Sequence, residues 1–301
     1  MNRKLSVLIV LLGGVSFGVL STIVKKSYDV GMNLGQISTS QAFLGAVLLW
    51  IFIFYKKVSD KNYKIEFKSK EAMILMFSGI STACTSIVYY KSLQYLSASM
   101  AILLLFQFTW IGNIIECVLE RKKLEMKKFI SLIILIVGTL LASNVLIDGF
   151  NINPIGLVFG LLSALSYCVF MYVNGKVITY VNPIQRSACM ITGATIFLVI
   201  VFFKSLFVGN ISFLSGFEYG IPLAFFGNVI PPVFFSMGVP IIGIGLSSIL
   251  GSIELPVATL CSVLILHEQT SLIRWCGILL ILTAIIIPVI SKKEKRKLEN
   301  I

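Results

Sequence analysis

Long apolar runs separated by short polar segments make up nearly all of this 301-residue chain. Most runs are about 20 residues long, which is the length that an α-helix needs to cross roughly 30 Å of hydrocarbon. Backbone polar groups in lipid must be satisfied within their own segment, so helices are expected, and the alternating segments of a β-barrel do not occur. The pattern predicts ten transmembrane helices, over 5–24, 34–55, 72–90, 98–119, 129–147, 156–173, 184–203, 219–237, 245–266 and 272–290.

The composition agrees with a membrane protein rather than a soluble one. The chain is 57% hydrophobic and only 13% charged, whereas about a quarter of the residues in a soluble domain are charged. The six cysteines and the single histidine show no metal-ligand spacing, and the sequence contains no nucleotide-binding loop. We therefore predict no metal, no cofactor and no enzymatic activity.

Positive charge is distributed unevenly among the loops. If the N-terminus is cytoplasmic, twenty of the 25 Lys and Arg residues lie on the inner side, as the positive-inside rule requires. We predict that the chain lies in the cytoplasmic membrane, with both termini in the cytoplasm and a basic tail over 292–301. The net charge of +12 then reflects the membrane, and no nucleic-acid partner is expected. The first run offers no cleavage site after small residues, so it is expected to be an uncleaved helix.

The two halves of the chain share a pattern with an offset of 146 to 148 residues. Gly79 in the third run, for example, matches Gly227 in the eighth. Each half has five spans, and this odd number gives the halves opposite orientations in the membrane. Inverted repeats are typical of secondary transporters, which bind substrate near the midplane, although channels can also be built this way. The predicted fold is an all-α integral membrane protein with two inverted five-helix repeats, over 1–147 and 148–291.

Several short motifs lie along the predicted helices and near their ends. They are found at 95–103, 119–121, 156–167, 255–258, 267–268 and 277–282. These stretches resemble the drug/metabolite transporter superfamily, specifically its EamA-type branch of ten helices. The chain differs from the family pattern at Phe17, Gln41 and Phe108, where tryptophan, arginine and proline are common. The resemblance implies transport of small metabolites, with export of amino acids or related compounds as the first expectation.

Glu254 lies near the expected centre of the ninth span, two positions before Pro256. A carboxylate at this depth costs about 3 kcal/mol on insertion scales and marks a functional site by default. Pro256 lacks a backbone donor, so the helix is expected to bend where Glu254 projects. We expect Glu254 either to contact a cationic or zwitterionic substrate or to carry a coupling proton. A structural hydrogen bond across a helix interface is the alternative.

Polar and aromatic residues in the other runs complete the predicted substrate site. Gln107, Trp110 and Asn113 are spaced by three and share one broad face of the fourth helix. Aromatic rings can hold an ammonium group by cation–π attraction, whereas Ser, Asn and Gln side chains can equally well join helices. The further candidates are Phe17, Ser86, Tyr89, Ser163, Tyr167 and Asn228, and Pro231, Pro232 and Pro256 are expected to act in gating.

Four other charged residues lie near the predicted helix ends. Glu116 and Arg186 could form an ion pair that closes the inner side, or each could extend to water. Glu120 and Glu268 end the fourth and ninth runs and are expected to close short turns.

Together these features predict a secondary transporter that moves a small polar or amphipathic metabolite by alternating access. Its expected partners are the small-molecule substrate and the lipid bilayer, with a coupling proton as an open alternative. Import of a small cation such as a quaternary amine is the alternative within transport. A non-transporting or lipid-handling membrane subunit is the alternative outside it. In a transporter, Glu254, Gln107 and the aromatic residues should meet at the midplane, whereas a scaffold would bury them in separate interfaces.

Overall fold

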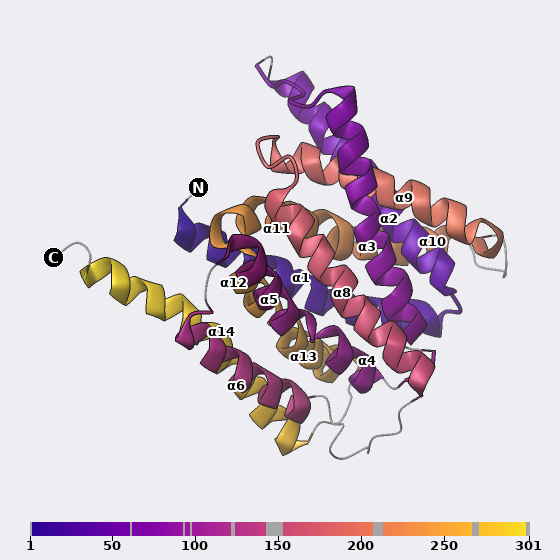
Figure 1. The fold of residues 1–301 in the computed structure, drawn as a ribbon. Helices are drawn as coiled ribbons and strands as arrows, with labels where there is room; N and C mark the ends of the chain where they lie inside the picture. The colour runs from indigo at the N-terminus through magenta and orange to yellow at the C-terminus, as the bar shows by residue number, and fades with distance from the viewer. Residues whose placement is uncertain are drawn as a thin grey trace.

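Helices make up most of the chain where the structure describes it. The computed structural model describes residues 2–60, 62–92, 94–96, 98–121, 124–142, 153–206, 213–266 and 271–298 (Figure 1). In chain order the helices are α1 (Arg3–Asp29), α2 (Leu34–Ser59), α3 (Ser69–Ser92), α4 (Ala98–Leu105), α5 (Phe108–Glu120), α6 (Met126–Ala142), α8 (Pro154–Lys176), α9 (Pro183–Leu206), α10 (Phe213–Leu223), the π-helix η1 (Ala224–Val229), α11 (Ile230–Ile242), α12 (Ile244–Gly251), α13 (Glu254–Leu266) and α14 (Leu272–Leu298).

The predicted apolar runs coincide with these helices. The fourth run is divided into α4 and α5, the eighth into α10, η1 and α11, and the ninth into α12 and α13. Within the described residues, eight helices are long and apolar enough to cross a membrane, and Leu103–Leu119 is a shorter apolar helix. The prediction of an all-α integral membrane fold is confirmed, and each of the ten predicted spans has a counterpart among the helices.

Some sequence predictions concern residues that the structure does not describe. The boundary between the proposed repeats, at 147–148, is one of them. Glu268, with the turn that it was expected to close, is another, and the side chain of Glu120 is a third.

The main helix–helix contacts follow the inverted repeat: they occur either as two equivalent pairs or between two equivalent helices (Figure 1). α3 packs against α8, and α1 packs against α11. Under the sequence offset α8 corresponds to α1 and α11 to α3, so these two contacts are equivalent. α2 packs against α9, and α6 against α14, and each of these pairs joins two equivalent helices. Helices from both halves therefore meet in each of these contacts, as two inverted repeats require.

Irregular positions in the second half leave some backbone carbonyls without a helical donor. Pro288 frees the carbonyl of Ala284 in α14, and Ser131 Oγ of α6 donates to it at 2.5 Å. In η1 the carbonyl of Phe226 accepts from Ser16 Oγ of α1 at 2.7 Å. Side-chain donors on neighbouring helices thus use the carbonyls that the prolines and the π-helix release.

The fourth and ninth spans are both broken near the middle, at equivalent positions of the two halves. α12 ends at Gly251 and α13 begins at Glu254, so the interruption expected beside Pro256 is confirmed. α4 ends at Leu105 and α5 begins at Phe108, although the first half contains no proline.

The side chain of Gln107 accounts for the break in the fourth span. Its Nε2 atom donates to the carbonyl of Leu103 at 2.9 Å, which is the carbonyl that the backbone N–H of Gln107 would bond in a regular helix. The backbone N–H bonds the carbonyl of Leu104 instead, at 3.2 Å. The side chain of Gln107 therefore interrupts the backbone hydrogen bonds of the fourth span, as Pro256 does in the ninth span by lacking an N–H group.

The loop between α2 and α3 and the first turn of α3 are bonded, at one end of the bundle, to the first turn of α9 and to the segment between α8 and α9. Gln185 Nε2 donates to the carbonyl of Lys64 at 2.8 Å. Tyr180 donates its phenol proton to Glu71, and this bond to a carboxylate raises the pKa of Tyr180 above its ordinary value. We call the end of the molecule that carries loop 60–68 the lysine-rich end.

Glu116 and Arg186 do not form the ion pair that was considered from the sequence. Lys128 Nζ of α6 lies 2.5 Å from Glu116 Oε2 of α5. Arg186 is fully buried and donates to the backbone carbonyls of Asn174 and Ser236. The predicted pairing is wrong because each charge has a nearer partner, and Arg186 does not extend to water either.

Candidate functional site

Glu254 is the first residue of α13 and projects from the break in the ninth span. Its Oε2 atom is buried and has no hydrogen-bond partner among the described residues. α1 crosses close to this point, since a Cβ atom at Gly18 would lie 2.7 Å from the carbonyl oxygen of Glu254. The N-terminus of a helix favours a negative charge, but burial without a donor opposes it. The site therefore contains an acceptor for which the described part of the chain supplies no donor.

Three tyrosines lie within electrostatic range of this carboxylate. Tyr89 and Tyr90 come from α3 and Tyr167 comes from α8, and a charge on Glu254 would influence all three phenol groups. The phenol oxygen of Tyr167 is buried and has no partner in the described structure. The structure thus brings together Glu254, Tyr89 and Tyr167, which the sequence indicated separately, and it adds Tyr90.

Aromatic rings from four helices pack around Tyr167. Its ring centroid lies 4.3 Å from that of Phe108 and 6.3 Å from that of Phe17. The ring of Phe235 lies 5.9 Å from those of Phe17 and Phe170. We call Phe17, Phe108, Tyr167, Phe170 and Phe235 the aromatic cluster. Three of its members were missed from the sequence, because phenylalanine is frequent in apolar spans and carries no sign of which face is central.

Gln107 and Trp110 bond to each other rather than to the aromatic cluster. Trp110 Nε1 donates to Gln107 Oε1 at 2.7 Å. The Trp110 side chain is 37% exposed and shares a helix face with Ile114 and Val118, which are 51% and 69% exposed. This face of α5 is an outer one, so the structure does not place Trp110 beside Glu254.

Asn113 is fully buried between α5 and α12. Its Nδ2 atom donates to the carbonyl of Thr109 at 2.8 Å and to that of Gly245 at 3.1 Å.

We expect Asn113→Ala to lower the stability of the protein by about 1–3 kcal/mol, because buried carbonyl acceptors lose their donor. Thermal unfolding of the purified protein measures this loss, and transport kinetics should show an unchanged KM. A raised KM at unchanged stability would instead make Asn113 a substrate ligand.

The remaining polar candidates form short-range or interhelical bonds. Ser86 Oγ and Ser163 Oγ donate to carbonyls about one turn earlier in their own helices, at 3.3 and 2.6 Å. The side-chain amides of Asn228 in η1 and Gln41 of α2 lie 3.3 Å apart and join the two helices. Ser86 lies one turn before Tyr89 on α3 and is therefore on the same face of that helix as a residue of the site. The bond of Asn228 instead joins η1 to α2.

The prolines expected to act in gating lie at helix discontinuities. Pro231 and Pro232 follow η1 directly, at the start of α11. Pro256 lies in the first turn of α13, where a proline costs little because the N–H groups of that turn have no helical acceptor. These positions are suited to a bend between helix segments, and a role in gating stays a prediction.

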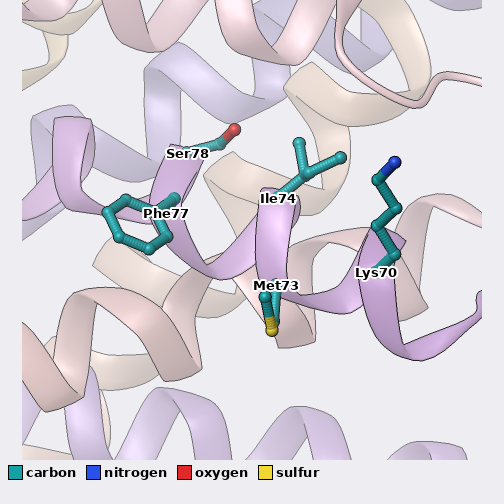
Figure 2. A pocket seen from close by; sticks show the side chains of 5 residues that line it. All are labelled: Lys70, Met73, Ile74, Phe77 and Ser78. Carbon is teal, nitrogen blue, oxygen red and sulfur yellow. The ribbon is translucent and has the colours of Figure 1, made fainter.

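A surface groove of about 500 Å³ lies on the first turns of α3 (Figure 2). Phe77, which lines it, is 75% exposed, so the groove belongs to the outer face of the helix. None of the predicted site residues borders it, and its lining residues are Lys70, Met73, Ile74, Phe77 and Ser78.

Comparison with known proteins gives the family of the chain. The model of the EamA-like transporter family matches residues 4–144 and matches a second time over 154–290. The chain belongs to this family. The resemblance inferred from the motifs is therefore confirmed, and the chain is a multi-pass membrane transporter of the drug/metabolite type.

One solved crystal structure has the same fold as this EamA-like chain. It aligns with a TM-score of 0.78 over 95% of this chain and 98% of the other, at 13% sequence identity. At this identity the likeness shows the fold alone. No curated protein matches the chain in sequence.

Proposed function

We propose that this EamA-like protein is a secondary transporter for a small metabolite that carries a positively charged amino group, such as an amino acid or an amine. The observation that supports the proposal most directly is the buried Oε2 atom of Glu254, which has no partner in the described structure and lies within electrostatic range of three tyrosine phenols. A ligand or a proton that binds there during the transport cycle would complete this group.

The chemistry of the site favours an ammonium group as the ligand. A carboxylate that loses water without gaining a donor is strongly destabilised, and a bound cation removes this penalty. The faces of aromatic rings attract cations most strongly where water is excluded. Glu254 and Tyr167, with the neighbouring ring of Phe17, would therefore hold an ammonium group from several sides.

The broken helices support movement around this site. Glu254 lies where α12 ends and α13 begins, and Gln107 lies at the equivalent break between α4 and α5. Discontinuous helices at the midplane are a common device for binding a solute between two inverted halves. In the proposed cycle the repeats over 1–147 and 148–291 move against each other, and Pro231, Pro232 and Pro256 permit the bends.

We further propose export across the cytoplasmic membrane, with the lysine-rich end and both termini in the cytoplasm. The distribution of Lys and Arg among the loops and the positive-inside rule support this orientation, and the resemblance to the EamA-type branch is what favours export. A proton that occupies Glu254 in the absence of substrate would couple transport to the proton gradient, and import of a small organic cation is the alternative direction.

A metabolite comparison tests the proposed function. Cells that express the protein and cells with an empty vector are grown in parallel, and amino compounds are quantified inside the cells and in the medium. We expect at least one amino compound to accumulate in the medium of the expressing cells, and reconstituted vesicles should then transport it. Equal distributions of all amino compounds, with the protein present in the membrane, would contradict the proposal.

A further inference from the structure

Arg186 is a fully buried arginine without a carboxylate partner in the described structure. It lies in the first turn of α9, and its two terminal nitrogens donate to backbone carbonyls of other helices. One bond runs to Asn174 in α8 at 2.5 Å and the other to Ser236 in α11 at 3.4 Å. The third nitrogen, Nε, is buried and has no partner in the described part of the chain. A buried charge satisfied only by carbonyls is unusual, because it costs several kcal/mol unless it is well paired.

Both carbonyls are available to Arg186 for identifiable backbone reasons. Asn174 lies in the last turn of α8, where carbonyls have no donor within the helix and where a positive charge is favourable. Pro240 in α11 lacks an N–H group, so the carbonyl of Ser236, four residues earlier, has no helical donor. Arg186 therefore joins one helix end and one proline-released carbonyl, and it connects three helices.

These contacts lie next to the aromatic cluster, toward the lysine-rich end, where the neighbouring Gln185 bonds Lys64. Asn174 and Ser236 lie four residues and one residue after the cluster members Phe170 and Phe235, and Asn174 Nδ2 donates to the carbonyl of Phe170 at 2.9 Å. A little farther on, α8 and α11 nearly touch, since a Cβ atom at Gly175 would lie 3.1 Å from the Val239 side chain. The guanidinium bonds of Arg186 therefore join α8 and α11 directly beside the residues of the aromatic cluster that these two helices carry.

The positions of the first half that correspond to Arg186 carry no arginine. The offset of 146 to 148 residues matches Arg186 with positions 38–40 of α2, which are Ser38, Thr39 and Ser40. The hydroxyl groups of Ser38 and Thr39 are buried and have no partner among the described residues. The guanidinium of Arg186 therefore has no counterpart at the matching positions of the first half, although the repeat relates the helices around both ends.

We propose that Arg186 is a latch that holds α8 and α11 together at the lysine-rich end and is released once in each transport cycle. The proposal rests on the proposed function, because the transport cycle is what would open and close the latch. A guanidinium bound to two carbonyls suits this role better than an ion pair with a carboxylate would. When the helices separate, the charge gains water and leaves no buried anion behind, so the open state is accessible.

The experiment measures access to the latch without measuring transport. Ser236→Cys is introduced in a chain whose six native cysteines are replaced by serine or alanine, and the protein is placed in lipid nanodiscs, where both faces meet the reagent. The rate of modification by a charged methanethiosulfonate reports opening at the lysine-rich end. Ser38→Cys, in a parallel protein, reports opening at the opposite end. Both serines are buried, and their hydroxyl groups have no partner in the described structure.

Two changes should release the latch by different routes. Arg186→Met removes the charge, and Pro240→Ala restores a backbone N–H that competes for the carbonyl of Ser236 while it leaves Arg186 intact. We expect each change to increase the modification rate of the Ser236→Cys reporter about tenfold or more, and to leave that of the Ser38→Cys reporter unchanged or slower. Pro288→Ala, which makes the same chemical change in α14, is the matched control and should alter neither rate.

The outcomes separate a latch from a merely structural arginine. Faster modification at both reporter positions would show general loosening and would overturn the proposal, as would unchanged rates in the two variants. If Arg186→Met fails to fold, the result for Pro240→Ala decides, because that variant keeps the guanidinium. If the latch opens as expected but no substrate is moved by the wild-type protein, the proposed function fails while the latch remains as a conformational device.

Discussion

Replacing Glu254 by glutamine is expected to lower transport at least tenfold while the protein still accumulates in the membrane. Glutamine preserves the size of the side chain but carries no charge, so it can neither pair with an ammonium group nor bind and release a proton. A hydrogen bond to a charged group contributes about 1.5–3 kcal/mol, which corresponds to a loss of roughly 10- to 150-fold in kcat/KM. Uptake or efflux in reconstituted vesicles, normalised to the amount of folded protein, measures the effect.

Two further changes make this result specific. Glu218→Gln in α10 makes the same substitution at an exposed position and should leave transport unchanged. Glu254→Asp keeps the charge and should retain part of the activity. If Glu254→Gln still exchanges substrate across the membrane but no longer responds to a proton gradient, the carboxylate carries the coupling proton. Unchanged transport in Glu254→Gln would exclude both roles and leave the residue as a structural contact.

The positions of the helices could be predicted from the sequence because each depends on a local property. A run of about 20 apolar residues has one stable form in lipid, and the interruption at Pro256 follows from its missing N–H group. The break at Gln107 could not be predicted in the same way. Glutamine is compatible with a continuous helix, and only the observed bond from its side chain to Leu103 shows that it replaces a backbone donor.

The candidate site could be predicted only in part, because partners between helices depend on packing. Glu254 was evident from its charge and depth, and the structure adds that Tyr89 and Tyr167 lie near it. The partners of Arg186 could not be found, since backbone carbonyls have no signature in a sequence. The repeat offset predicted which helices are equivalent, but it did not predict which faces of these helices are in contact.

Substituting alanine at Gly79 or Gly193 is expected to prevent stable folding of the protein. α3 and α9 cross in direct backbone contact. A Cβ atom at Gly79 would overlap the backbone of Met190, and one at Gly193 would overlap the backbone of Met76. Backbone atoms cannot move aside as a flexible side chain can, so the helices would have to separate along much of their length. Overpacking of this kind costs about 1–3 kcal/mol or more, and thermal unfolding and membrane abundance measure it.

Gly251→Ala provides the matched control for steric overlap. A Cβ atom there would meet Met171 and Phe108 only at 3.6 Å, an ordinary contact distance, so stability should be unchanged or slightly raised.

The contrast between these variants tests the arrangement of the two halves. α3 and α9 come from different repeats, and they are in contact only if the repeats interlock as described. Wild-type stability of both Gly79→Ala and Gly193→Ala would mean that this crossing is wider than the structure has it. Additive losses in the double variant would indicate two separate contacts, whereas a double variant no worse than either single one would show that one displacement of α3 from α9 relieves both.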